Sequence, residues 1–231
     1  MIKAIQAFSR SRFISTKRSA ASPMSKLPAI KQQVRFLYLF HAIKALNTGN
    51  QPFIVQFVAS QHGEGATTIA TGFAEAAASQ SNKSILFVDC HPSCSFQYRP
   101  ASLIESFFDD GTIHGAVHKT TDIPCVAMAR LSPVEGTFPN IDFDDLSRLF
   151  ALLKETFSII VLDCPPPSDA PETLSIARYS DGTVLVVRAE TTPQSLVIET
   201  KQALERFGAQ IIGTVFNQYR SYIPSWLQQR L

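Results

Sequence analysis

Residues 53–68, with the sequence FIVQFVASQHGEGATT, constrain the fold of this chain more than any other stretch. The apolar start predicts a buried strand, a loop with Gly63 and Gly65 follows, and the alanine-rich run after the loop predicts a helix. This order is typical of a phosphate-binding P-loop, in which backbone N–H groups and a helix N-terminus hold phosphate oxygens. We therefore expect a nucleotide site at this turn.

The loop departs at two positions from the pattern G-x-x-x-x-G-K-[ST]. Ala66 stands at the lysine position, and Ser60 or Gln61 stands at the first glycine position. Thr67 keeps the hydroxyl that binds Mg²⁺ in such loops. Losing one charge-assisted contact costs roughly 1.5–3 kcal/mol, so we expect binding of ATP or ADP with Mg²⁺ to be weak or absent. The expected nucleotide-binding residues are Gly63, Glu64, Gly65, Ala66, Thr67 and Thr68.

Apolar strands alternate with helices along most of the chain. Strands are predicted at residues 53–59, 84–89, 125–131, 157–163, 182–188 and 211–216, and helices at 31–46, 67–79, 101–108, 143–156, 169–179 and 193–207. Continuous apolar strands separated by helices indicate a mostly parallel sheet with helices on both faces. The predicted fold is a three-layer α/β sandwich of the P-loop NTPase-like class.

Two of the predicted strands end in an aspartate. Asp89 ends SILFVD and Asp163 ends FSIIVLD, at the carboxyl edge where α/β sheets bind ligands. As catalytic residues, Asp163 could hold Mg²⁺ through water and Asp89 could position or deprotonate an attacking group. The expected metal site is Thr67, Asp89 and Asp163. The alternative is that both carboxylates only cap turns.

Five segments together resemble one family. Residues 60–68 are similar to S-x-x-P-G-E-G-K-[ST]-T, 85–89 to the acidic strand LIDAD, 159–166 to IIDTPP, 181–192 to DGVLLVVRxxxT and 213–217 to G-x-VLN. These are motifs of the bacterial tyrosine autokinases of polysaccharide synthesis, within the wider MinD/ParA-type deviant P-loop ATPases. The resemblance covers about residues 31–217, and it is specific as a set although each segment alone is weak.

The departures from the family pattern fall on catalytic positions. Beside Ala66 at the lysine, Gln61 stands where MinD and ParA relatives have a second lysine. His91 takes the second place of the family's D-x-D, and Ser93 replaces the arginine that follows it. The resemblance therefore implies a degenerate member with weak or absent ATP turnover.

Further departures concern assembly and the tail. The family's ring-forming motif E-x-x-R-x-x-R corresponds to Gln32, Arg35 and Tyr38, so only the arginine is kept. The tyrosine-rich tail is reduced to Tyr219 and Tyr222. The apolar face of helix 31–46 either packs on the sheet or docks at a subunit interface. The second alternative would allow a homo-oligomer.

The resemblance implies a cytoplasmic protein that assists exopolysaccharide or capsule synthesis and export. Its expected partner is an inner-membrane polysaccharide polymerisation or co-polymerase protein, and it could lie peripherally at that membrane. One alternative is an active ATPase or protein tyrosine kinase completed by a partner's basic residue. Another is a MinD/ParA-like positioning ATPase on membrane or DNA. Under the leading hypothesis we expect no nucleic-acid partner.

The charge distribution divides the chain. The first 63 residues hold nine of the 21 Lys and Arg and no Asp or Glu, for a net charge of +9, whereas 12 basic and 19 acidic residues give −7 beyond them. We expect a basic, disordered head at 1–30 and a single P-loop NTPase-like domain at 31–231 that ends in a helix at 221–231. The head could instead contact anionic lipid or an acidic protein face, or be a mitochondrial-type presequence.

Cysteines and apolar runs exclude two classes of protein. The four cysteines lack C-x-x-C spacing, so no zinc site of that type is indicated. Cys90 and Cys164 follow the strand-end aspartates and are expected to be reduced and buried. No apolar run reaches the ~18 residues that a membrane-spanning helix needs.

Overall fold

The computed structural model describes residues 4–8, 27–47, 51–81, 83–92, 101–119, 126–132 and 142–219. Its strands are β1 (Ala4–Phe8), β2 (Phe53–Ala59), β3 (Ile85–Asp89), β4 (His118–Lys119), β5 (Val126–Arg130), β6 (Ile159–Cys164), β7 (Gly182–Arg188) and β8 (Ile211–Asn217). They form one eight-stranded sheet in the order β1-β8-β7-β2-β6-β3-β5-β4. Every pairing is parallel except that of β4 with β5.

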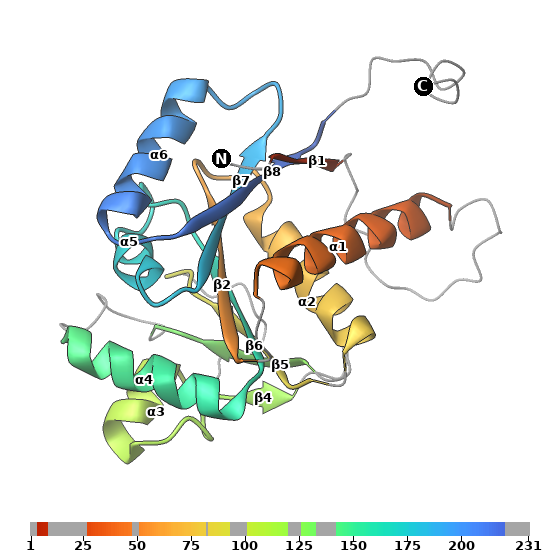
Figure 1. Cartoon of the computed structure of the whole chain (residues 1–231). Helices are drawn as coiled ribbons and strands as arrows, with labels where there is room; N and C mark the ends of the chain where they lie inside the picture. The colour runs from red at the N-terminus through yellow and green to blue at the C-terminus, as the bar shows by residue number, and fades with distance from the viewer. Residues whose placement is uncertain are drawn as a thin grey trace, which may run out of the picture.

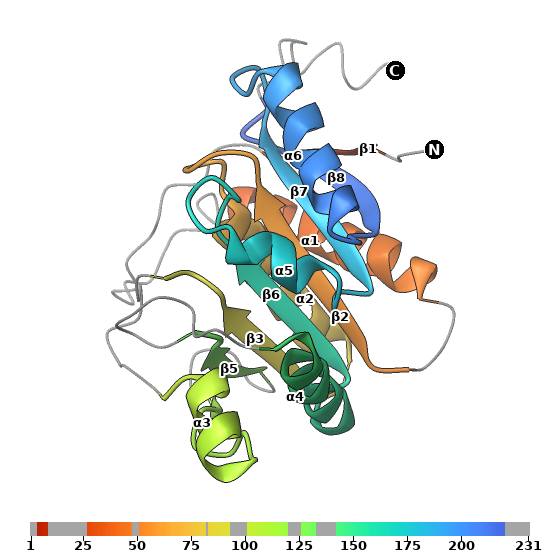
Figure 2. The same cartoon turned by 90° about the vertical axis from the view of Figure 1, so that its left-hand side faces the viewer.

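Helices cover both faces of this sheet, as predicted. The helices are α1 (Leu27–Leu46), α2 (Ala66–Gln80), α3 (Leu103–Asp110), α4 (Phe143–Thr156), α5 (Glu172–Ala177) and α6 (Gln194–Arg206). Figures 1 and 2 show α1 and α2 on one face and the other four helices on the opposite face. Successive residues of β2 alternate between two apolar cores, with Val55 and Phe57 in one and Ile54 and Val58 in the other. The three-layer α/β prediction is confirmed.

The polar residue in the middle of β2 has its hydrogen bonds satisfied inside the core. The Gln56 side chain is fully buried. Its Nε2 donates to the carbonyl of Thr173 at 3.0 Å, and its Oε1 accepts from Thr183 Oγ1 at 3.0 Å. Because buried amides are costly only when unpaired, Gln56 ties β2 to β7 and α5 at little cost.

Helix α1 packs on α2 through the apolar face expected from its spacing. Phe36, Leu39, Phe40 and Ile43 are buried, and the rings of Phe40 and Phe73 lie 6.0 Å apart between centroids. The face is therefore buried by packing within the chain, mainly on α2 rather than directly on the sheet. The opposite face of α1 is exposed at Val34 and Tyr38, and Leu46 is exposed at the end of the helix.

The close approach of the two helices depends on a glycine in α2. A Cβ built on Gly72 would lie 2.2–2.4 Å from the Phe36 ring. We expect Gly72→Ala to lower the free energy of unfolding by about 1–2 kcal/mol, since overpacking outweighs the helix propensity that alanine gains. In a Phe36→Ala background the same change should instead stabilise the protein. A urea-unfolding double-mutant cycle measures this sign change, with Gly115→Ala, which meets no close neighbour, as control.

Three features of the amino-terminal part and the sheet edges differ from the predictions. Residues 4–8, expected to be disordered, form β1, which pairs with β8 with Ala4 opposite Thr214. Helix α1 begins at Leu27 rather than at residue 31, and the two-residue strand β4 was not predicted. Edge pairing of this kind uses backbone groups, which leave little trace in an apolar pattern.

Other predictions about the ends of the chain stay predictions. The expected helix at 221–231 lies outside the described residues, and the division into a head and one domain remains an expectation. Among the described helices, none combines the length and the apolar character that crossing a membrane requires.

Candidate functional site

Three neighbouring parallel strands bring the predicted site residues to one edge of the sheet. The sheet order places β6 between β2 and β3. Asp163 in β6 lies opposite Phe57 in β2 and opposite Asp89 in β3. Because parallel strands end on the same side, the loop after β2 and both aspartates meet there.

The loop after β2 has the backbone of an anion-binding turn. Gly63 and Gly65 have positive φ angles of 83° and 93°. A Cβ on Gly65 would also lie 2.2 Å from Asn217 Nδ2, so only glycine fits there. Helix α2 then begins at Ala66. The first N–H groups of a helix lack intrahelical acceptors, so this turn can donate to a phosphate.

Glu64 supports the loop from inside. Its carboxylate is buried and accepts hydrogen bonds from the backbone N–H of Ser60 at 2.7 Å and of Gln61 at 3.2 Å. It also accepts from the Thr192 hydroxyl, and its carbonyl accepts from Asn217 Nδ2 at 2.8 Å. The Glu64 side chain is thus committed to holding the loop, which leaves only its backbone N–H for a ligand.

The first residues of α2 differ in what they present. The Ala66 methyl group is buried and carries no charge, whereas the side chains of Thr67 and Thr68 are exposed. Thr67 lies near enough to Asp163 to lower the pKa of that carboxyl group. The hydroxyl and the carboxylate expected to share Mg²⁺ are therefore adjacent.

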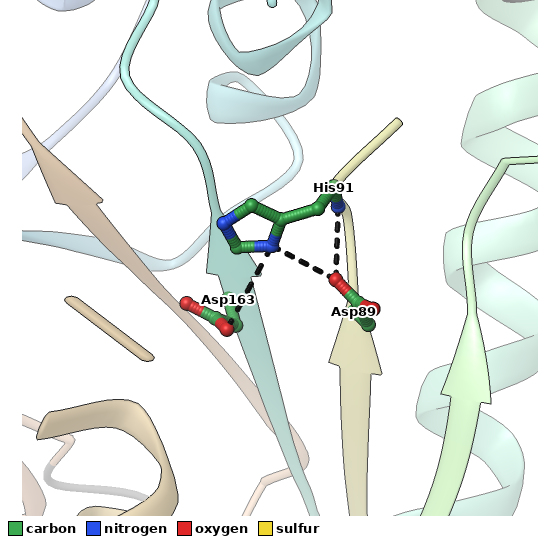
Figure 3. Close-up of side chains that lie close together, drawn as sticks. All are labelled: Asp89, His91 and Asp163. Carbon is green, nitrogen blue, oxygen red and sulfur yellow. Dashed lines mark hydrogen bonds and ion pairs between the residues drawn. The ribbon is translucent and has the colours of Figure 1, made fainter. Parts of the chain in front are cut away.

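His91 joins the two aspartates (Figure 3). Its Nδ1 lies 2.8 Å from Asp89 Oδ1 and 3.8 Å from Asp163 Oδ2. The His91 backbone N–H donates to the same Asp89 oxygen at 2.9 Å, and the His91 carbonyl accepts from Arg130 Nη2 at 3.3 Å. Arg130 is fully buried. The backbone N–H and the carbonyl of His91 are therefore both hydrogen-bonded, which fixes the position of the imidazole ring at the end of β3.

The surroundings shift the pKa of two of these groups. Burial raises the pKa of Asp163 to about 6, although His91 and Thr67 lower it. For His91, burial opposes the charged ring, but the hydrogen bond to Asp89 and the charges of Asp163, Asp89 and Asp169 together raise its pKa above 6.5. Both groups therefore hold their protons to a higher pH when the chain is folded.

These shifts predict a pH dependence of stability in metal-free protein. Above pH 3.8 Asp163 ionises in the unfolded chain while the folded chain still holds the proton. The free energy of unfolding therefore falls as the pH rises towards 6. The His91 contribution is complete below 6.5 and is lost as the pH rises through the folded pKa. We expect the difference in melting temperature between wild type and Asp163→Asn/His91→Asn to shrink from pH 5 to pH 8, measured in EDTA. A pH-independent difference would contradict it.

The structure thus assembles Thr67, Asp89 and Asp163, while their roles in binding and catalysis remain predictions. Prediction from sequence missed the contacts of Asn217 and Thr192 with the loop. A signal existed for Asn217, because it is a polar residue at the carboxyl end of a strand, as Asp89 is.

Comparison with known proteins points to a bacterial kinase fold, although no family model matches the chain. The tyrosine-protein kinase CpsD of Streptococcus agalactiae is 23% identical over 192 residues, which cover 78% of this chain and 81% of CpsD. The kinase domain of Escherichia coli tyrosine kinase ETK superposes with a TM-score of 0.74 at 15% identity, over 97% of this chain and 94% of that domain.

Two further solved structures share the architecture. The chimerical protein CapA2B2 has a TM-score of 0.73 at 19% identity, over 95% of this chain and 96% of its own. The septum site-determining protein MinD of Pyrococcus horikoshii, solved with Mg-ADP, has a TM-score of 0.56 at 19% identity, over 78% of this chain and 76% of MinD. The chain therefore has the P-loop fold of bacterial tyrosine kinase domains, which MinD shares.

Proposed function

We propose that this chain is a catalytically degenerate, tyrosine-kinase-like P-loop protein that assists capsule or exopolysaccharide synthesis and export by binding a partner. The observation that carries the proposal is the retention of the kinase fold around a loop in which Ala66 offers no cation. The likeness to the tyrosine-protein kinase CpsD over most of both chains supports the kinase-like part of the proposal, and the resemblance of the sequence motifs to the autokinases of polysaccharide synthesis supports the polysaccharide context.

The chemistry of the loop argues for weak turnover. In P-loop enzymes the lysine contacts the β- and γ-phosphates, and negative charge develops on the transferred group in the transition state. Without that ammonium, transition-state stabilisation suffers more than ground-state binding. The glycines and Thr67 still support residual binding of ATP or ADP with Mg²⁺, as the Mg-ADP complex of MinD suggests by analogy.

The outward face of α1 supports a role in binding. Tyr38 is 70% exposed, and Val34, one turn before it, is also exposed. Arg35 is exposed beside them. Aromatic and arginine side chains are typical anchors of interfaces. We propose that this face and the basic head contact an inner-membrane co-polymerase.

A second function is favoured by what the site keeps. Thr67, Asp163 and the phosphate-binding backbone remain in place, so an arginine or lysine from a partner could replace the missing charge. In that case the protein is a kinase or ATPase that is active only in complex. Phosphotyrosine at Tyr219 or Tyr222 after incubation with ATP would favour this alternative.

The test combines nucleotide calorimetry with partner binding. The full chain is titrated with ATP and Mg²⁺, alone and with the cytoplasmic segments of a co-polymerase encoded beside it. The proposal expects no turnover in either case, and partner binding that Tyr38→Asp weakens at least tenfold. Exposed Phe207→Asp on the opposite side of the sheet is the matched control. ATP affinity tighter than about 10 μM with turnover near one per second, in the range of ordinary enzymes, would overturn it.

A further inference from the structure

The cluster of Asp89, His91 and Asp163 has the geometry of a metal site in its own right (Figure 3). One donor atom of each residue lies within 4.8 Å of the other two. His91 Nδ1 is 2.8 Å from Asp89 Oδ1 and 3.8 Å from Asp163 Oδ2. Donors about 2.1 Å from one ion lie about 3 Å apart at octahedral angles and about 3.4 Å apart at tetrahedral angles. The observed spacings bracket these values, so small side-chain rotations would admit an ion.

An independent observation concerns the oxygens that His91 does not contact. Asp89 and Asp163 are 3% and 2% exposed. Within the described residues, Asp89 Oδ2 and Asp163 Oδ1 are buried and lack a hydrogen-bond partner. Buried carboxylate oxygens without a donor are costly and uncommon in native proteins. A cation held by both carboxylates would offset their buried negative charge, and bidentate binding would bring these two oxygens into its coordination.

The residues around the cluster fix its donors in advance. Arg130 Nη2 holds the His91 carbonyl at 3.3 Å, and the His91 N–H holds Asp89 Oδ1 at 2.9 Å. Thr67, at the start of α2, lies beside the Asp163 carboxyl group. Such outer contacts orient metal ligands and typically contribute 10–100-fold to affinity. The site is therefore largely organised before any ion binds.

The imidazole nitrogen decides which class of ion fits. Mg²⁺ prefers oxygen ligands in octahedral geometry, whereas imidazole suits Zn²⁺ and other first-row transition metals. We propose that Asp89, His91 and Asp163 bind Zn²⁺ or another divalent transition-metal ion, and that they do so without nucleotide. This site differs from the all-oxygen Mg²⁺ site expected at Thr67, Asp89 and Asp163, which depends on bound phosphate. It stands whether or not the proposed partner function is correct.

The experiment uses Co²⁺ as a spectroscopic probe of the full chain. Metal-free protein, prepared with EDTA and kept free of nucleotide, is titrated with Co²⁺. We expect ligand-field absorption in the visible range that saturates at one ion per chain. Zn²⁺ should remove this absorption stoichiometrically, because it binds this donor set more tightly than Co²⁺. A thousandfold excess of Mg²⁺ should leave it unchanged.

Substitutions at the histidine separate the proposal from adventitious binding. His91→Asn should lower Zn²⁺ affinity at least a hundredfold by calorimetry, since it removes a ligand rather than an outer contact. His91→Asp should weaken Zn²⁺ and strengthen Mg²⁺, because three carboxylates form an oxygen site. Exposed His114→Asn is the matched control and should bind as wild type does. Circular dichroism verifies folding, and Asp163→Asn serves if a His91 variant does not fold.

Two results would overturn the inference. One is equal Zn²⁺ affinity in wild type and in His91→Asn or Asp163→Asn, which would place any bound ion elsewhere. The other is no saturable Co²⁺ absorption, which would leave a protonated His91 as the counter-charge of the two aspartates. Both experiments measure metal binding alone, so either result can be told apart from a failure of ATP binding or partner binding.

Discussion

Ala66→Lys is expected to raise the affinity of the chain for Mg-ATP by about ten- to a hundredfold. The new ammonium would stand at the start of α2, directly after the loop glycines, where P-loop enzymes contact the β- and γ-phosphates. One charge-assisted contact of this kind contributes roughly 1.5–3 kcal/mol. The methyl group at residue 66 is buried, so we expect the apolar stem of the lysine to be buried while its charged end reaches outward.

Calorimetry with ATP and Mg²⁺ measures this gain, and two variants isolate its cause. Ala66→Met adds a side chain of similar length without charge, so the difference between lysine and methionine reports the ammonium alone. Gln80→Lys adds the same charge at the other end of α2, about 21 Å away at 1.5 Å per residue. Equal ATP affinity in all three variants and wild type would show that the loop has lost phosphate binding altogether.

Turnover is expected to lag behind binding in Ala66→Lys. His91 still occupies the space between Asp89 and Asp163, so a metal ion bound there would have a nitrogen ligand. The missing lysine therefore affects the binding of phosphate, and the histidine affects the binding of a metal ion, at the same carboxyl edge of the sheet. Restoring one of them should leave the other effect in place.

Much of the fold follows from local pattern. Strands such as VLVV in β7 are apolar at successive residues and are buried on both faces, whereas a surface strand alternates between apolar and polar residues. The continuous apolar pattern alone therefore predicts a parallel sheet that is covered on both faces. The meeting of Asp89 and Asp163 also follows, since parallel strands present their carboxyl ends to one edge. Local chemistry therefore located the candidate site, before any contact between its side chains was known.

The contacts within the site do not follow from local pattern. Thr192 and Asn217 reach Glu64 across 128 and 153 residues of sequence. Spacing along the chain carries no signal for such pairs, because strand order decides them. The same holds for β1, which pairs with β8 from the opposite end of the described chain. Apolar periodicity indicates which residues are buried, but it does not indicate which residues or strands pair with one another.

Glu64→Ala is expected to lower the free energy of unfolding by about 3 kcal/mol or more. The buried carboxylate accepts from the backbone N–H groups of Ser60 and Gln61 and from the Thr192 hydroxyl. Removing it leaves the buried Ser60 N–H and two partly buried donors unpaired, at about 1–3 kcal/mol for a buried donor and less for the others. The free energy of unfolding of Glu64→Gln should lie between those of wild type and Glu64→Ala. An amide keeps one acceptor oxygen but turns its NH₂ group towards the other donors.

Urea unfolding measures the stability change, and hydrogen exchange of the Ser60 and Gln61 amides locates it. Glu199→Ala, an exposed glutamate on α6, is the matched control and should change stability little. Faster exchange confined to the loop would show that Glu64 holds the phosphate-binding backbone in shape. If Glu64→Ala unfolds like wild type with unchanged exchange, the loop is held by its glycines and Asn217, and the glutamate is free to act on a ligand.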